Sequence, residues 1–335
     1  MENILQVKDL ETKFHTKKGV IRAVDHVSFE VGKGKVIGLV GESGCGKSMT
    51  ALSIMGLVPS PPGEVTASEI LLNQRDIAKL SHSVLCNIRG KEISMIFQEP
   101  MTSLNPVYTV GRQVGEAVSI HQKNVGKAEI RERVVETFDL VGIPEPASRF
   151  GAYPHQLSGG LRQRVMIAMA LICKPELLIA DEPTTALDVT IQAQILSLMM
   201  GLRERLHTSI IMITHDLGVI AEVCDHVNVM YAGKIVETAN VFDLFDKPSH
   251  PYTRGLLRSI PSVTEQGRRK HLDSIRGIVP NLLYLPNGCS FNPRCDKALD
   301  ICRQEKPEFF DLGGGHHVSC WLHEKQGEAN DSAVD

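Results

Sequence analysis

Apolar side chains follow two different patterns along the first two thirds of the chain. Residues 1–35 alternate between apolar and polar positions around a turn signal at residues 17–19, which predicts short antiparallel strands. Residues 36–40 are instead a continuous apolar run, as expected for a buried parallel strand, and residues 177–180 and 209–213 are interpreted as a second and a third strand of this kind. Helical spacing of apolar residues predicts helices over residues 47–57, 110–120, 127–140, 161–173 and 188–206. Strands that alternate with helices predict a layered α/β fold.

The pattern changes after about Gly233. Prolines become frequent, and four of the eight cysteines lie within residues 280–320. We therefore expect a main α/β domain over residues 1–240 and a small, loop-rich, cysteine-containing domain over residues 241–325. The polar residues 326–335 are expected to form a disordered tail.

Composition excludes several classes of function. The 335 residues include 36 Lys and Arg against 39 Asp and Glu, and the resulting net charge of −3 excludes a strongly basic nucleic-acid coat. Aromatic residues make up only 5%, which argues against a base-stacking surface, so we predict no nucleic-acid partner. The longest apolar run, Val165–Cys173, is shorter than the roughly 20 residues of a membrane span. The N-terminus lacks a signal-peptide pattern, so we expect a cytosolic protein with reduced thiols.

A phosphate-binding motif follows the first continuous apolar run. Residues 41–48, Gly-Glu-Ser-Gly-Cys-Gly-Lys-Ser, fit the pattern G-x-x-x-x-G-K-[ST] between a predicted strand and a predicted helix. The glycines let backbone N–H groups surround phosphate oxygens, Lys47 can reach the β- and γ-phosphates, and the Ser48 hydroxyl can bind Mg²⁺. A chance match occurs in on the order of one per cent of such chains.

Two carboxylates end another buried strand. Asp181 suits the Mg²⁺ shell through water, and Glu182 suits polarisation of the water that attacks the γ-phosphate. The alternative is a pair of solvated carboxylates in a loop, although Pro183 fixes the exit from the strand.

A Ser-Gly-Gly sequence precedes the helix predicted over residues 161–173. Ser158 can cap that helix, and Gly159 and Gly160 leave its first N–H groups open to an anion. Taken alone, this sequence is better explained as a simple N-cap beside a flexible loop.

Together these motifs resemble those of ABC-type ATPases. Residues 41–48 correspond to the Walker A motif of that family, residues 157–161 to its signature motif and residues 177–182 to its Walker B motif. The resemblance covers roughly residues 4–240. It implies an ABC-type P-loop ATPase core with an antiparallel β subdomain and an α-helical subdomain at about residues 99–165.

The same resemblance implies the roles of individual residues in binding ATP and Mg²⁺. Gln98 corresponds to the Q-loop glutamine, residues 186–188 to the D-loop and His215 to the switch histidine; Gln98 and His215 join Glu182 as catalytic residues. Phe14 takes the place of the adenine-stacking aromatic residue, although packing on a strand explains it equally well. The residues implied to hold Mg²⁺ are Ser48, Gln98 and Asp181. The residues implied to contact the nucleotide are Phe14, Gly41, Ser43, Gly44, Cys45, Gly46, Lys47, Ser48, Met49, Gln98, Asp181, Ser158, Gly159 and Gly160.

One position departs from the family pattern. Leu161 stands where the common signature has glutamine, but the Ser-Gly-Gly sequence is intact, so we expect little loss. In this family the signature loop completes the ATP site of a second subunit, so Ser158 and Gly160 are expected to serve that partner's site. ATP binding would close the dimer and hydrolysis would reopen it, with Gln98 coupling the change to a membrane subunit.

Four cysteines near the C-terminus form a candidate metal site. Cys289, Cys295, Cys302 and Cys320 have five, six and seventeen intervening residues. Zinc sites usually contain C-x₂₋₄-C pairs, so these longer spacings suit a [4Fe–4S] cluster at least as well as zinc. The alternatives are four unrelated thiols, or ligation that includes the pair His316–His317. A structural staple is favoured over a redox sensor. The remaining cysteines are interpreted as core or incidental residues: Cys45, Cys86, Cys173 and Cys224.

The C-terminal part resembles that of dipeptide and oligopeptide importer ATPases, most clearly in residues 250–257 and 288–295. This implies a bacterial importer with two membrane subunits, an extracytoplasmic binding protein and a paralogous ATPase partner, with this chain peripheral on the cytoplasmic face of the inner membrane. It also favours [4Fe–4S] over zinc. Nickel and glutathione importers have similar regions, so their substrates are alternatives.

Two other ABC classes fit less well. Soluble ABC ATPases of DNA repair or translation usually carry long coiled coils or two fused ATPase halves, and neither pattern occurs here. Many export ATPases are fused to membrane spans, and the C-terminal region argues against an exporter.

Overall fold

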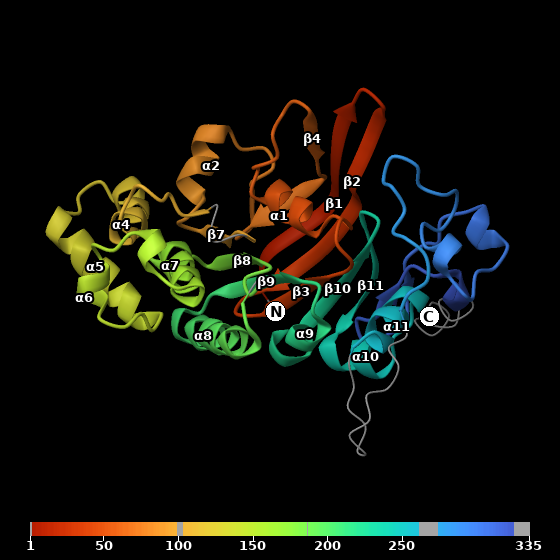
Figure 1. The fold of residues 1–335 in the computed structure, drawn as a ribbon. Coiled ribbons are helices and arrows are strands. Elements are labelled where there is room, and N and C mark those ends of the chain that lie inside the picture. The colour runs from red at the N-terminus through yellow and green to blue at the C-terminus, as the bar shows by residue number, and fades with distance from the viewer. Residues whose placement is uncertain (1, 99–102, 186, 261–273, 325–335) are drawn as a thin grey trace, which may run out of the picture. The chain divides into compact units, whose positions relative to one another are not determined.

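The computed structural model describes residues 2–98, 103–185, 187–260 and 274–324 (Figure 1). The predicted tail at 326–335, Glu99 and Pro100 after Gln98, and Ala186 of the expected D-loop lie outside this part. The chain divides into two compact units. The first contains residues 1–4, 31–35 and 79–212, and the second contains residues 5–30, 36–78 and 213–335.

The second unit contains an antiparallel sheet, as the alternating N-terminal pattern predicts. Its strands are neighbours in the order β2-β1-β5-β6, and β4 also pairs with β1. β1 pairs with β4 in a register that sets Phe14 opposite Gly63. The strands are β1 (Asn3–Thr16), β2 (Gly19–Gly32), β4 (Gly63–Thr66), β5 (Glu69–Leu72) and β6 (Arg75–Asp76).

A second sheet of the same unit carries the phosphate-binding motif. β3 (Val36–Val40) is buried along its whole length and pairs in parallel with β10 (His226–Tyr231). β11 (Lys234–Asn240) continues this sheet antiparallel to β10 and pairs in turn with β13 (His317–Val318), beside β12 (Phe310–Asp311). The strands of the C-terminal region therefore extend the sheet that contains β3.

Short helices accompany this second sheet. α9 contacts β3, and α10 contacts β10 and β11. The helices of the unit are α1 (Lys47–Ile54), α9 (Leu217–Val223), α10 (Val241–Asp246) and α11 (Pro251–Arg258). The cysteine-bearing region contributes three 3₁₀ turns, η2 (Asn292–Arg294), η3 (Ile301–Arg303) and η4 (Trp321–His323).

The first unit combines buried strands with a group of helices. β7 (Ile93–Ile96) and β8 (Leu177–Asp181) pair in parallel, with β9 (Ser209–Thr214) next to β8. α4, α5 and α7 contact one another, with Val134 and Phe138 of α5 fully buried. Its described residues form the helices α2 (His82–Ile88), α4 (Val110–His121), α5 (Lys127–Leu140), α6 (Pro146–Arg149), α7 (Gly159–Leu171) and α8 (Val189–Leu206), with the 3₁₀ turn η1 (Pro154–Gln156).

The long helices and the three predicted buried strands match their prediction, because residues 36–40, 177–180 and 209–213 form β3, β8 and β9 with ends within one residue. The helices predicted over residues 110–120, 127–140 and 188–206 are present with ends within one residue. The helix predicted over residues 47–57 is shorter, because α1 ends at Ile54. The described part of residues 58–150 also contains four strands, β4 to β7, and α2, none of which the apolar pattern predicted. Among the described residues no helix is long and apolar enough to span a membrane.

Candidate nucleotide-binding and hydrolysis site

The phosphate-binding motif forms a turn between β3 and α1 that only glycine permits at two positions. Gly41 has φ 155°, and a Cβ there would lie 2.2 Å from the carbonyl oxygen of Met230. Gly46 has φ 110°, and a Cβ there would lie 2.4 Å from the carbonyl oxygen of Ala23. The chain therefore reverses tightly and delivers Lys47 at the start of α1, the geometry that exposes backbone N–H groups to phosphate.

Lys47 lies over the loop that precedes it. Its ammonium group donates to the carbonyl oxygens of Gly41 at 2.8 Å and Glu42 at 3.1 Å, and the residue is only 5% exposed. Cys45 Sγ lies 3.8 Å from the same nitrogen. Burial raises the pKa of Cys45, which therefore stays a neutral thiol beside the cation.

Two further candidate residues belong to the same unit. Phe14 is half-buried on β1, and its ring lies 3.3 Å from the position a Cβ would take on Gly63. This contact agrees with strand packing and leaves the adenine-stacking role as a prediction. His215 is exposed and follows β9, directly before Asp216, whose side chain accepts from Gly218 N–H at 2.8 Å and caps α9.

The first unit places the Walker B carboxylates at the carboxyl end of β8. Asp181 is the last residue of the strand and is 4% exposed. Glu182 leaves the strand with φ 46°, in the left-handed region that side chains seldom adopt. Its Oε2 accepts from Gln98 Nε2 at 3.1 Å and from Thr185 Oγ1 at 2.8 Å. The structure thus brings together Gln98 and Glu182, which are 84 residues apart, and fixes the direction of the Glu182 carboxylate.

The signature residues lie at the start of α7 in the same unit. The Ser158 side chain caps this helix by accepting from Leu161 N–H at 3.4 Å, and both Ser158 and Gly159 are exposed. Leu161 contributes only its backbone N–H to this cap, so leucine in place of the glutamine common in the family leaves the cap intact. Gln163, buried on the next part of α7, donates to the Pro183 carbonyl at 2.5 Å and ties the signature helix to the Walker B exit.

The four C-terminal cysteines line one pocket, together with Phe291. The backbone N–H of Cys289 donates to the carbonyl of Cys302 at 2.8 Å, which joins two of the four segments. Burial raises the pKa of Cys289 to about 11 and that of Cys320 to about 12. Thiols with such pKa values ionise at neutral pH only when a cation compensates the thiolate charge.

A different group of possible metal ligands occurs on β1 and β2. Ligand atoms of Glu11, Asp25 and His26 lie within 4.8 Å of one another. Lys13 approaches Glu11 at 2.5 Å and Lys234 approaches Asp25 at 3.2 Å, so lysine cations already balance these carboxylates. We interpret this group as an ion-pair cluster and not as a metal site.

Known proteins resemble the chain in both of its sequence regions. The family "ABC transporter" matches residues 24–185, and the family "Oligopeptide/dipeptide transporter, C-terminal region" matches residues 236–302. An oligopeptide transport ATP-binding protein from Bacillus subtilis, AppD, is 53% identical over 98% of this chain and 99% of its own. A dipeptide transport ATP-binding protein from Escherichia coli, DppD, is 49% identical over 95% of this chain and 96% of its own.

The chain belongs to the ABC transporter ATPases.

Solved structures agree with this assignment. A dimeric ATP-binding cassette bound to ADP and Pi superposes with a TM-score of 0.64 at 26% identity, over 71% of this chain and 98% of that one. The protein cbiO1 from Clostridium perfringens, part of the cbiONQ transporter complex, superposes with a TM-score of 0.62 at 28% identity, over 74% of this chain and 92% of its own. The resemblance stated from the sequence motifs is confirmed, and the ABC ATPase fold with it.

Membership in this family fixes the broad activity. As an ABC ATPase the protein binds ATP with Mg²⁺ and hydrolyses it, and it couples hydrolysis to transport. The family also implies dimerisation and membrane permease partners.

Polar contacts at three places in this ABC ATPase's motifs were not predicted from the sequence. They are Thr185 on Glu182, Gln163 on Pro183 and the contacts of Glu42 described below. Thr185 lies three residues after Glu182, so the contact between their side chains could have been expected from their closeness in the sequence. The other two join segments with no local signal that connects them.

Proposed function

We propose that this ABC ATPase powers the uptake of dipeptides or oligopeptides as a subunit of a bacterial binding-protein-dependent importer. The observation that carries the proposal is the match of residues 236–302 to the oligopeptide/dipeptide transporter C-terminal region, added to about 50% identity with peptide transport ATPases over nearly the whole chain. We assign residues 1–240 to the nucleotide-binding domain, with a helical subdomain near 99–165, and residues 241–325 to a small C-terminal domain.

The first unit supplies the groups proposed to activate water. Glu182 acts as the general base, because its carboxylate stands at the exit of a buried strand and is oriented by Gln98 and Thr185. Gln98 senses the γ-phosphate and Mg²⁺ and transmits their presence to the membrane subunit. Asp181 binds Mg²⁺ through water together with Ser48.

The second unit supplies the groups proposed to hold the phosphates. The backbone N–H groups of residues 43–48 surround the phosphate oxygens, and Lys47 exchanges its carbonyl partners for the β- and γ-phosphates. His215 contacts the γ-phosphate, and Phe14 stacks on the adenine. Charge that develops on the transferred phosphoryl group is stabilised by Lys47 and Mg²⁺.

A second ATPase subunit completes each site. The exposed Ser158 and Gly159 and the half-buried Gly160, at the α7 N-terminus, would face the γ-phosphate of ATP bound by the partner. We propose that the partner is a paralogue, and that ATP closes this heterodimer while hydrolysis reopens it. Two permease subunits and an extracytoplasmic binding protein complete the importer, with this chain peripheral on the cytoplasmic face of the inner membrane.

The four cysteines are proposed to hold a [4Fe–4S] cluster. Among the described residues, which include all four, no three cysteine Sγ atoms lie within 4.8 Å of one another. Zinc at about 2.3 Å from each sulfur would hold its thiolates about 4 Å apart. The shared pocket, and a set in which any three sulfur atoms include a pair more than 4.8 Å apart, suit a larger cluster better. Cys289, Cys295, Cys302 and Cys320 would supply thiolate ligands, and the cluster would act as a structural staple for a region with few buried residues.

Hydrolysis by the assembled importer tests the ATPase assignments. The complex of this chain with its partner ATPase and permeases should hydrolyse ATP faster when the loaded binding protein and a dipeptide are added. Glu182→Gln should bind ATP but lose hydrolysis, and Lys47→Ala should lose binding. Stimulation by nickel or glutathione with no response to peptides would overturn the substrate proposal and leave the assignment as an ATPase intact.

Metal analysis tests the cluster separately. Anaerobic purification should give about four iron and four acid-labile sulfide per chain, with a broad visible absorption that Cys295→Ser removes. One zinc per chain without iron would contradict the cluster proposal. A Cys295→Ser chain that folds normally but hydrolyses ATP under altered control would replace the staple with a regulatory role.

A further inference from the structure

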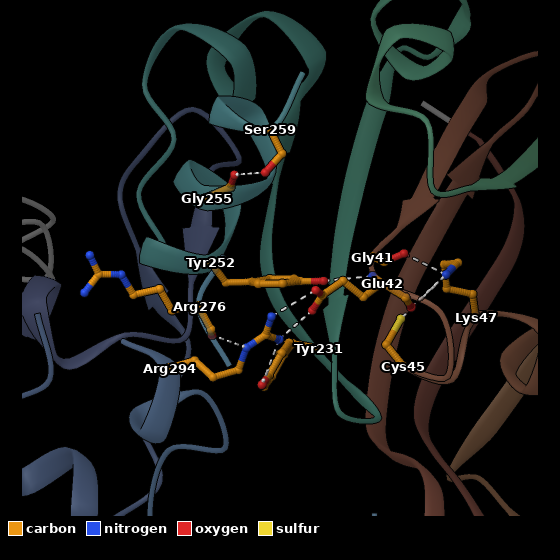
Figure 2. A network of polar contacts seen from close by, with 10 residues as sticks. All are labelled: Gly41, Glu42, Cys45, Lys47, Tyr231, Tyr252, Gly255, Ser259, Arg276 and Arg294. Carbon is orange, nitrogen blue, oxygen red and sulfur yellow. Dashed lines mark hydrogen bonds and ion pairs between the residues drawn. The ribbon is translucent and has the colours of Figure 1, made fainter. Parts of the chain in front are cut away.

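A polar network joins the cysteine-bearing region to the phosphate-binding loop within the second unit (Figure 2). The guanidinium of Arg294 forms a bidentate ion pair with the Glu42 carboxylate. Nη1 donates to Oε2 at 2.6 Å, and Nη2 donates to Oε1 at 3.0 Å. The Arg294 side chain is only 5% exposed. The hydroxyl of Tyr252, on α11, accepts the Glu42 backbone N–H at 2.8 Å.

Glu42 is the residue of the loop on which these contacts converge. Its side chain meets Arg294, its N–H meets Tyr252, and its carbonyl accepts from the Lys47 ammonium at 3.1 Å. The residue that holds Lys47 in place is thus itself held by two side chains from the C-terminal region. Charge-assisted two-pronged contacts of this kind are the most directional that a carboxylate forms.

Hydrogen bonds hold the backbone around Arg294. Its Nε donates to the carbonyl of Arg276 at 3.0 Å, and it ends the turn η2 directly before Cys295. Asn292, in the same turn, donates to the carbonyls of Cys289 at 2.8 Å and Cys302 at 3.2 Å. The position of Arg294 therefore depends on the backbone that carries three of the four cysteines.

Aromatic packing fixes the other half of the network. The rings of Tyr231, Tyr252 and Phe291 form a mutual cluster, with centroids 4.7, 5.2 and 5.4 Å apart. Tyr252 and Phe291 are both buried, and Phe291 directly precedes the turn η2 of the cysteine-bearing region. Tyr252 belongs to this aromatic cluster and Arg294 lies beside it, so both residues that contact Glu42 are supported by the same packing.

Charge gives the contact a consequence for nucleotide binding. Glu42 is a residue of the loop proposed to receive a triphosphate, so its carboxylate adds a negative charge to that loop, and like charges at short range weaken binding. The guanidinium of Arg294 neutralises that carboxylate without occupying the loop. Since Lys47 carries the charge proposed to meet the phosphates, a free Glu42 carboxylate would also compete with ATP for Lys47.

We propose that Arg294 is a positioning residue of the ATP site: by neutralising and holding Glu42, it lets the cysteine-bearing region set the affinity of the loop for nucleotide. The inference rests on the proposed role of residues 41–48 in binding phosphate. It extends that role, because the C-terminal region becomes a part of the nucleotide site and not only an appendage of the importer.

Equilibrium binding of a fluorescent ATP analogue with Mg²⁺ to the full chain tests the proposal. Arg294→Gln should raise the Kd about tenfold and change kcat at saturating ATP less than twofold. Glu42→Gln combined with Arg294→Gln should return the Kd to within about twofold of wild type, because no uncompensated charge remains. The single-variant defect should shrink at about 0.5 M salt, since screening acts on charge and not on packing.

Two controls separate this effect from a fault in folding. Arg276→Gln should bind like the wild type, because Arg276 contributes its backbone carbonyl to the network while its side chain points away (Figure 2). Arg294→Lys keeps the charge but not the two-pronged contact, so its Kd should lie between those of the wild type and Arg294→Gln. It remains informative if Arg294→Gln does not fold.

The outcomes that would overturn the inference are distinct from failure of the site itself. An unchanged Kd in Arg294→Gln, with binding lost in Lys47→Ala, contradicts the role of Arg294 and leaves the phosphate site standing. A double variant as weak as Arg294→Gln contradicts the charge argument. Unimpaired binding by Lys47→Ala removes the site, and the inference falls with it.

Discussion

Replacement of Glu237 by glutamine should loosen the C-terminal region from the sheet that carries it. Glu237 lies on β11 and is fully buried. Its Oε1 accepts Ser249 N–H at 2.6 Å and meets His316 Nε2 at 2.8 Å, and its Oε2 accepts His250 N–H at 2.9 Å. One carboxylate thus joins β11, the start of α11 and the segment before β13.

The magnitude follows from the donors around this carboxylate. A glutamine fills the same volume but has one acceptor oxygen, and its NH₂ group would face a backbone N–H or the His316 nitrogen. Each buried donor left without an acceptor costs about 1–3 kcal/mol, so the substitution should destabilise the region by about 2–5 kcal/mol. Burial opposes the Glu237 charge, but these donors outweigh it and hold the pKa of Glu237 below its ordinary value.

The chain has a single tryptophan, so its fluorescence can follow unfolding of one region. Trp321 lies in η4 and donates to the Glu305 carbonyl at 3.1 Å, so its fluorescence reports on the cysteine-bearing region. In urea, the Trp321 transition of Glu237→Gln should move down by about 1–2 M. Glu308→Gln, at an exposed position of the same region, is the matched control and should not move it. An unchanged transition in Glu237→Gln would refute the reasoning.

Three further changes have defined outcomes. Glu182→Gln should lower hydrolysis by about 10²–10⁴-fold while ATP binding is kept, whereas the exposed Glu176→Gln should hydrolyse normally; equal loss in both would contradict the role of Glu182. Tyr252→Phe leaves the Glu42 N–H without an acceptor and should lower the free energy of unfolding by about 1–3 kcal/mol, while Phe at the exposed Tyr284 should have no effect. Burial lowers the pKa of His250 to about 4, so between pH 6.5 and pH 4 the unfolded chain binds a proton that the folded chain does not. Stability should therefore fall as pH falls through this window, by about 2 kcal/mol between pH 6.5 and pH 5, and His250→Asn should flatten that slope.

The nucleotide site could be predicted from the sequence because its residues lie in short local motifs. The turn at residues 41–48 needs glycine at positions 41 and 46, because at each position a backbone carbonyl occupies the space that a Cβ would take. The two glycines are therefore part of the sequence motif itself. Residues 177–181 read as a buried strand because every position is apolar until Asp181. Such signals depend on neighbours within a few residues, which is why they carry both the element and its chemistry.

Contacts between distant segments left no comparable signal. Arg294 and Glu42 are 252 residues apart, and nothing around either residue indicates the other. The strands β4 to β6 are two to four residues long, too short for a period to show. β4 and β5 form because β1 offers an edge to pair with, and β6 pairs with β5. The convergence of the four cysteines was predicted from their number and not from their spacing, and the structure places them around one pocket.

The most direct test of the account is uptake of a radiolabelled dipeptide by cells from which this gene has been deleted. The wild-type chain should restore ATP-dependent uptake, and an excess of unlabelled peptide, but not nickel or glutathione, should compete. Glu182→Gln, expressed to the same level, should restore none. Peptide uptake that is unaffected by the deletion, or restored equally by Glu182→Gln, would contradict the claim that ATP hydrolysis by this chain drives peptide import.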